Sequence, residues 1–329
     1  METAIIETEL GEVSPAIKNL RAMVKTVYGF QFMRIITGNR IAANFRSKLG
    51  LKPSEKEKED KESQKTLVDL RVRYKRITDG IANEGIPKMK NFKGDELITE
   101  WGELALLENY FSLLAREEKM FRQIEMIMVD FPIYSEFLHK IKGCGPAMSA
   151  IIVSCMDIRK AKYVSSLWKY SGLAVMPDGK AQSMRKEHLV LVKYKDKDGV
   201  EKEKLSITFN PFVKSKMLGV LASSFLRSGN DKYAPIYQNY KHRLENHAIY
   251  KDTTKLHRHR MASRYMIKEF YKDLYATWRP IEGLPVHPEY SIAKLGMIPH
   301  GLDIDFAPDE IINPYASGDD EEDVIDYPT

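Results

Sequence analysis

The stretch that decides the fold is IKGCGPAMSA, residues 141–150. It places an apolar-x-Gly-apolar-Gly turn between two segments of helical spacing, which is the pattern of a helix-hairpin-helix. Two glycines allow a tight turn with positive φ, and backbone N–H groups at the start of the second helix then point outward. Because a helix N-terminus attracts anions, the turn predicts contacts with nucleic-acid phosphates. A Gly-rich turn can also join two helices for packing alone, and that alternative stays open.

Helical periodicity extends from this turn in both directions. A helix over 14–49 is expected to start at Ser14-Pro15 and to break near Gly38-Asn39. One long coiled-coil-like helix over 96–129 carries an apolar stripe that a helix of this chain or of a second copy must cover. Further helices are expected over 66–81, 134–141, 147–156, 163–170, 211–226, 233–246 and 256–278, the last ended by Pro280.

Two runs rich in β-branched residues, Leu189–Val192 and Ser206–Phe209, flank an Asp198-Gly199 turn signal and predict a basic β-hairpin. The expected fold is therefore mainly α: a helical bundle with a long coiled-coil-like helix, a helix-hairpin-helix and one inserted β-hairpin. We divide the chain into an N-terminal helical region (1–95, with a charged linker at 52–65), a DNA-binding domain (96–279, with the hairpin at 187–210) and an extended acidic tail (280–329).

Charge is distributed unevenly along the 329 residues. The net charge is +5, yet residues 301–329 hold ten acidic side chains and no Lys or Arg. Positions 1–300 therefore carry 51 basic against 36 acidic residues. A basic body with an acidic end is typical of a protein that binds a polyanion, although a solvated charged surface would give the same composition.

Other function classes find little support in the sequence. No apolar run reaches the roughly 20 residues of a membrane span, and the start of the chain is acidic, so we expect a cytoplasmic protein without membrane contact. Cys144 and Cys155 are too isolated to form a zinc ligand set, and the histidines have no companion ligands at fixed spacing. We assign no metal site.

The candidate DNA-binding residues fall into three groups. The predicted turn contributes Lys142, Gly143, Cys144, Gly145 and Ala147. A basic segment later in the chain contributes Lys180 and Arg185. The last long helix contributes Arg258, Arg260, Arg264 and Lys268, and its residues 264, 268 and 272 are spaced to share one face, opposite apolar side chains such as Met266 and Phe270.

The order of these features resembles a known family. A long helix, the Gly-x-Gly-Pro turn, a helix ending in Tyr170-Ser171-Gly172-Leu173-Ala174 and the step Asp178-Gly179-Lys180 are similar to the C-terminal half of the insertion sequence 110 transposases, from about Leu97 to Trp278. The resemblance implies DNA transposition or recombination. It also implies an N-terminal RuvC-like domain, whose Asp and Glu residues bind divalent metal, and a nucleophilic serine in the C-terminal domain.

The chain departs from that family in two respects. Residues 1–96 show no buried strand ending in Asp, so no catalytic carboxylate is assigned, no cofactor is evident, and Mg²⁺ is expected only if the protein is an active recombinase. Where the family has its serine, this chain has Asp178. Ser183 is the fallback nucleophile, but the sequence shows no neighbour that would activate it. With Ser183 and Asp178 as the catalytic candidates, we expect DNA binding without strand cleavage.

Two other function classes remain open. A structural or assembly protein could self-associate through residues 96–129. An RNA-binding partner would present the same basic surface, and the resembled family uses a guide RNA.

Overall fold

The computed structural model describes residues 14–48, 72, 92, 94, 98–197 and 199–289. This part of the chain is mainly helical with one two-stranded antiparallel hairpin, as the sequence predicts. It forms two compact units, residues 14–127 and the described residues from Met128 onward. The expected linker at 52–65, the expected helix at 66–81 apart from Val72, and the acidic tail beyond Glu289 lie outside the described residues. No helix of the described part is both long and apolar enough to cross a bilayer.

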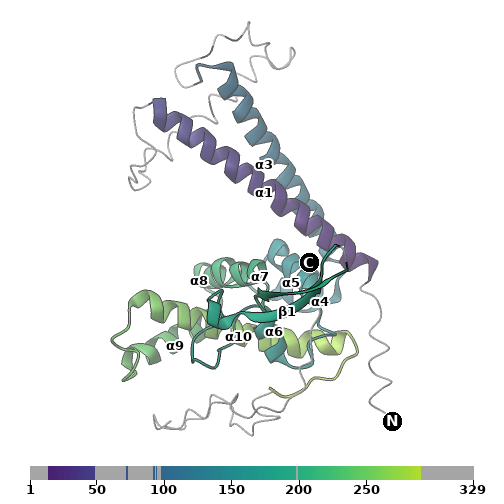
Figure 1. Cartoon of the computed structure of the whole chain (residues 1–329), viewed down its shortest axis with the longest axis vertical. Coiled ribbons are helices and arrows are strands. Elements are labelled where there is room, and N and C mark those ends of the chain that lie inside the picture. The colour runs from purple at the N-terminus through teal and green to yellow at the C-terminus, as the bar shows by residue number, and fades with distance from the viewer. Residues whose placement is uncertain are drawn as a thin grey trace. The chain divides into compact units, whose positions relative to one another are not determined.

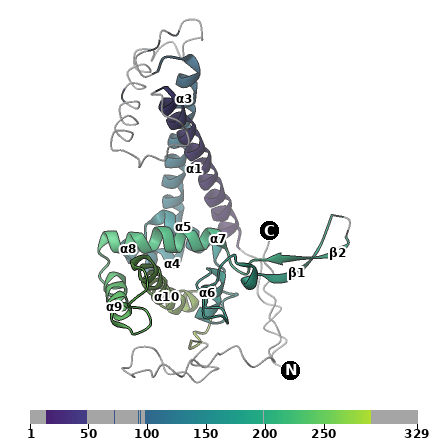
Figure 2. The same cartoon turned by 60° about the vertical axis from the view of Figure 1, so that its left-hand side comes forward.

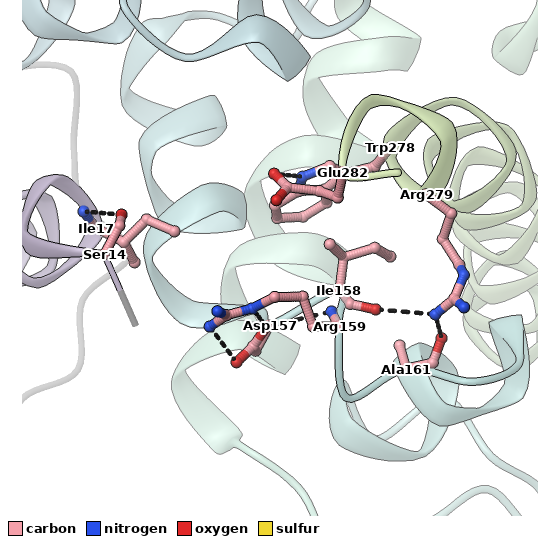
Figure 3. Close-up of polar contacts among 9 residues, drawn as sticks. All are labelled: Ser14, Ile17, Asp157, Ile158, Arg159, Ala161, Trp278, Arg279 and Glu282. Atoms are coloured by element: carbon pink, nitrogen blue, oxygen red, sulfur yellow. Dashed lines mark hydrogen bonds and ion pairs between the residues drawn. The ribbon is translucent and has the colours of Figure 1, made fainter. Parts of the chain in front are cut away.

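The first unit is a pair of helices, α1 (Pro15–Lys48) and α3 (Trp101–Met128), that lie side by side (Figure 1). At the start of α1, Ser14 Oγ accepts a hydrogen bond from the N–H of Ile17 (Figure 3). The expected break at Gly38 is wrong, because α1 continues through it. A Cβ on Gly38 would lie 3.1 Å from the ring of Tyr110, so this glycine serves close helix packing.

The apolar stripe of α3 is covered by α1 of the same chain. Ile41 and Phe45 of α1 share a buried cluster with Leu104 and Leu107 of α3. The α3 helix begins at Trp101, five residues later than expected, because the Glu103 carboxylate accepts the backbone N–H groups of Thr99 and Glu100. This contact caps the helix start in the manner of a capping box.

The second unit is built around α5 (Pro146–Cys155), which is largely buried, and α10 (Lys255–Ile281), which buries one face. The other elements are α4 (Pro132–Glu136), η2 (Leu138–Lys140), α6 (Val164–Tyr170), η3 (Lys186–His188), α7 (Pro211–Ser215), η4 (Lys216–Leu221), α8 (Ala222–Ser228) and α9 (Tyr233–Asn246). Pro280 does not end α10 but sits in its last turn, where only one backbone hydrogen bond is lost. The Arg279 side chain anchors that turn to the carbonyls of Ile158 and Ala161 (Figure 3).

The hairpin pairs β1 (Val190–Lys195) with β2 (Glu201–Ser206), Val190 lying opposite Ser206. The turn is where the sequence placed it, and Gly199 has a φ of +78°. The second strand was expected at 206–209 and instead ends at Ser206. Thr208 leaves the strand to accept a hydrogen bond from Gln182, and Phe209 is buried. The strands extend away from the helices of their unit (Figure 2).

Candidate nucleophile and cation site

Asp178 occupies the tip of a small turn that leads directly to Ser183. Val175 and Ala181 form an isolated antiparallel bridge, and the Gln182 N–H donates to the Ala174 carbonyl. Gly179 closes the turn with a φ of +71°. The Asp178 carboxylate accepts the N–H of Lys180, which fixes its orientation.

His188 brings the two catalytic candidates together. Ser183 Oγ lies 2.9 Å from His188 Nδ1, and His188 Nε2 lies 3.1 Å from Asp178 Oδ2. The short helix η3 folds the chain back after Ser183 and places the imidazole between the two side chains. Only 3% of His188 is exposed, whereas Ser183 is half-buried. The result is a serine, histidine and aspartate in hydrogen-bonded series.

The geometry also fixes which ring nitrogen carries the proton. The backbone N–H of Ser183 donates to His188 Nδ1 at 3.1 Å, so Nδ1 presents a lone pair. Nε2 is then the protonated nitrogen and donates to Asp178. A base that removes a proton from Ser183 requires this tautomer.

Asp178 is held in its ionised form. The N–H of Lys180 lowers the pKa of this carboxyl below its usual value, and the hydrogen bond from His188 lowers it further. An ionised carboxylate on Nε2 orients the imidazole and stabilises the positive charge that the ring gains as a base.

Sequence reasoning missed His188, and the sequence showed no neighbour of Ser183, whereas the structure places this histidine within hydrogen-bond distance of Ser183 Oγ. Asp178, Ser183 and His188 follow one another at steps of five residues, and this spacing has no regular helical or strand meaning. The series depends on the turn at Gly179 and on η3, neither of which has a periodic signal.

A lysine that the sequence did not single out approaches the same loop. Lys214 of α7 donates from Nζ to the Gln182 carbonyl, the peptide group whose nitrogen belongs to Ser183, and the ammonium lies 4.3 Å from the centre of the Phe209 ring. Burial lowers the pKa of Lys214 to about 8, and the charge of Arg264 adds to this effect.

The segment 170–174 explains how Lys214 is positioned. Asn210, which caps α7, donates to Tyr170 Oη, and its backbone N–H donates to the Tyr170 carbonyl. A Cβ on Gly172 would lie 2.7 Å from Lys214 Cδ, so only glycine leaves room for the lysine stem. Ser171 Oγ lies 2.6 Å from Tyr271 Oη, which joins the same segment to α10.

The basic face of α10 contains four cations at four-residue spacing, and they differ in whether they form ion pairs. Arg260, Arg264 and Lys268 make no ion pair with any carboxylate of the described residues, whereas Lys272 pairs with Glu269 and Glu289. Lys268 lies over the Trp168 ring, 5.0 Å from its centre. Burial lowers the pKa of Lys268 to about 8, with further lowering by Lys272 and Arg264 and smaller opposing effects of Glu289 and Glu269.

The predicted turn at 141–150 joins η2 to α5, and its two glycines differ. Gly143 has a φ of +93°. A Cβ there would lie 2.8 Å from Ser228 Oγ, so α8 packs directly against this glycine inside the unit. Gly145 has a φ of −73°, contrary to the expected positive value, and its Cβ position is open. Cys144 is buried, which raises its pKa to about 12.

Lys142 and Gly145 are the exposed residues of the turn, and Gly143, Pro146 and Ala147 are half-buried. Asn230 donates to the Lys142 carbonyl and accepts the N–H of Tyr233, which fixes the turn to the start of α9. The amides of Gly145 and Ala147 donate to no acceptor among the described residues.

The remaining candidates lie in different surroundings. Arg258 is buried, and its guanidinium donates to the carbonyls of Tyr250, Lys251 and Thr253, so it stabilises a loop. Arg185 is exposed, and its N–H donates to Ser183 Oγ. Lys180 is exposed, and its Nζ lies 3.7 Å from Asp178 Oδ2.

No group of three His, Cys, Asp or Glu residues within the described ranges is arranged to hold a metal ion. No family model and no curated protein matches the chain. The resemblance to the transposase family therefore rests on the Gly-x-Gly-Pro turn and on residues 170–174 and 178–180.

Proposed function

We propose that the protein binds the backbone of DNA and uses Ser183 as a nucleophile on a phosphodiester, in the manner of a recombinase. The observation that carries this proposal is the hydrogen-bonded series Ser183, His188 and Asp178. His188 lies beside Ser183, which the sequence did not reveal. This contact supports a proposal of strand cleavage, whereas the sequence alone favoured binding without cleavage.

The proposed chemical step uses the contact between Ser183 and His188. Ser183 Oγ–H gives its proton to His188 Nδ1, and the oxygen attacks phosphorus. The Oγ–P bond forms as the bond from phosphorus to the leaving oxygen breaks, and the proton passes from Nδ1 to that oxygen. Asp178 stays ionised throughout. Attack by a second hydroxyl on the serine phosphodiester would restore Ser183 and join the strands.

Phosphodiesters suit this site better than carbonyl substrates because its surroundings are cationic. Lys214 contacts the peptide bond of Ser183, and Lys214 and Arg264 are close enough for the arginine charge to depress the lysine pKa. The exposed Lys142 and the open amides of Gly145 and Ala147 add a second place for backbone phosphates.

A phosphodiester that contains no nucleotides tests attack by Ser183 without knowledge of the DNA target site. Bis(para-nitrophenyl) phosphate should give a burst of nitrophenolate equal to the protein concentration, because attack by Ser183 leaves a covalent phosphodiester. Ser183→Ala should abolish the burst, and His188→Gln should slow it. A burst that persists in Ser183→Ala would refute the assignment of the nucleophile.

Binding is tested separately with a random-sequence duplex. We expect the affinity to fall with salt by a log-log slope of about −0.9 per phosphate contact. Competition with structured RNA, and sizing at low and high salt, distinguish this proposal from an RNA partner and from an assembly protein. Salt-insensitive oligomers that bind no nucleic acid would favour the assembly protein.

A further inference from the structure

Three cations of α7 and α10 are costly to the fold. Lys214, Arg264 and Lys268 are all partly or largely buried, and no described carboxylate pairs with them. An unpaired buried charge is destabilising. Arrangements that cost stability are retained where a ligand uses them.

One contact joins these cations to the loop of Ser183, and Lys214 lies close enough to Arg264 to feel its charge. Lys214 donates to the Gln182 carbonyl, Lys268 covers Trp168, and Arg264 lies one helical turn before Lys268 on α10. The bond between Ser171 and Tyr271 fixes α10 to the segment that positions Lys214. All of these residues belong to the second unit.

Some buried polar atoms of these residues and of their neighbours have no hydrogen-bond partner. Among the described residues, the buried side-chain atoms that have no hydrogen-bond partner are Trp168 Nε1, Gln182 Oε1, Arg258 Nε and Arg264 Nε. Two of these four atoms are relevant to an anion: Arg264 Nε belongs to one of the three cations, and Trp168 Nε1 belongs to the ring that Lys268 covers. Both groups are N–H donors only. An anion with several oxygens satisfies such donors and neutralises the adjacent cations.

We propose that Lys214, Arg264 and Lys268 form a clamp that holds the phosphodiester attacked by Ser183, an inference that rests on the proposed function. Arg264 offers a planar fork to two phosphate oxygens, and the two lysines act as point charges. In the attack on phosphorus, they stabilise the negative charge that builds on the non-bridging oxygens. The clamp thus positions the substrate, while Ser183 and His188 carry the proton and the new bond.

The test compares methionine variants in the full chain. Lys214→Met, Arg264→Met and Lys268→Met should each weaken binding of a fluorescent random-sequence duplex about tenfold and reduce the magnitude of the salt slope by about one. Lys272→Met is the matched control, because Glu269 and Glu289 already neutralise that lysine, and it should bind as the parent does. Equal affinities for Arg264→Met and Lys272→Met would overturn the clamp.

A second probe separates the clamp from the wider proposal. Inorganic phosphate should raise the Tm of the parent and of Lys272→Met above that of a chloride control of equal ionic strength, and it should do so less for Arg264→Met. If phosphate acts in this way but duplex DNA does not bind, the clamp stands and the DNA function fails. If Ser183 gives its burst and none of the three variants changes duplex or phosphate binding, the clamp fails and the nucleophile stands.

Discussion

Ser183 Oγ lies 2.9 Å from His188 Nδ1, at the only ring nitrogen of that histidine that presents a lone pair. This relationship turns a serine of ordinary reactivity into a candidate nucleophile. It depends on Asp178 behind the ring, since the carboxylate holds the proton on Nε2.

Asp178→Asn should slow the nitrophenolate burst by about 10²-fold or more while leaving duplex affinity unchanged, because the amide no longer stabilises a charged imidazole. Burst kinetics and anisotropy measure the two effects on the same samples. Equal burst rates for Asp178→Asn and the parent would show that His188 has only a packing role in the loop and does not act as a base.

The two glycines of the 141–150 turn should behave differently when each is replaced by valine. Gly143→Val should unfold or strongly destabilise the protein, since φ is +93° and the new Cβ would meet Ser228. Gly145→Val should cost less than about 1 kcal/mol and still weaken duplex binding by obstructing backbone approach. Circular dichroism and anisotropy separate these outcomes. If Gly145→Val is folded and binds the duplex as tightly as the parent, the turn only packs the helices together and does not contact DNA.

Two neighbouring lysines of α10 should have opposite effects on stability at pH 7. Lys268→Met should raise the Tm by a few degrees, because a buried ammonium without a carboxylate partner is removed. Lys272→Met should lower the Tm, since Glu269 and Glu289 lose their cation. Thermal unfolding of both variants decides the point, and a lower Tm for Lys268→Met would show that this lysine stabilises the fold.

Duplex affinity should fall as the pH rises from 7 to 9. Lys214 and Lys268 have pKa values of about 8, so both are charged below that pH and lose their protons above it. DNA phosphates do not titrate in this range, and each lysine therefore contributes up to about tenfold. Replacing both lysines by arginine should remove the pH dependence, because arginine stays charged. A parent affinity that is flat across this range would contradict the role of the two lysines.

The sequence predicted those parts of the fold that depend on period and turn chemistry. The cap at Ser14, the helix Tyr233–Asn246 and the Gly199 turn follow from local residue choice. The sequence predicts helix breaks at Pro280 and Gly38 because both residues lower helix stability locally. The contacts that offset this loss, those of Arg279 and Tyr110, involve distant segments.

The candidate site was less accessible to sequence reasoning. Asp178 and Ser183 were recognised through the family resemblance, but His188 and Lys214 enter through tertiary contacts alone. Conversely, Arg258 has the charge expected of a DNA contact and instead binds three carbonyls of its own loop. Charge patterns indicate a polyanion partner without showing which cations remain available to it.

The most direct test of the central claim is to identify the residue that becomes phosphorylated. The parent should be treated with bis(para-nitrophenyl) phosphate, digested and mapped by mass spectrometry. The peptide containing Ser183 should carry a single nitrophenyl phosphate group, and the His188→Gln sample should carry much less. Label on another residue, or equal labelling of Ser183 with and without His188, would contradict the assignment of Ser183 as a nucleophile activated by histidine.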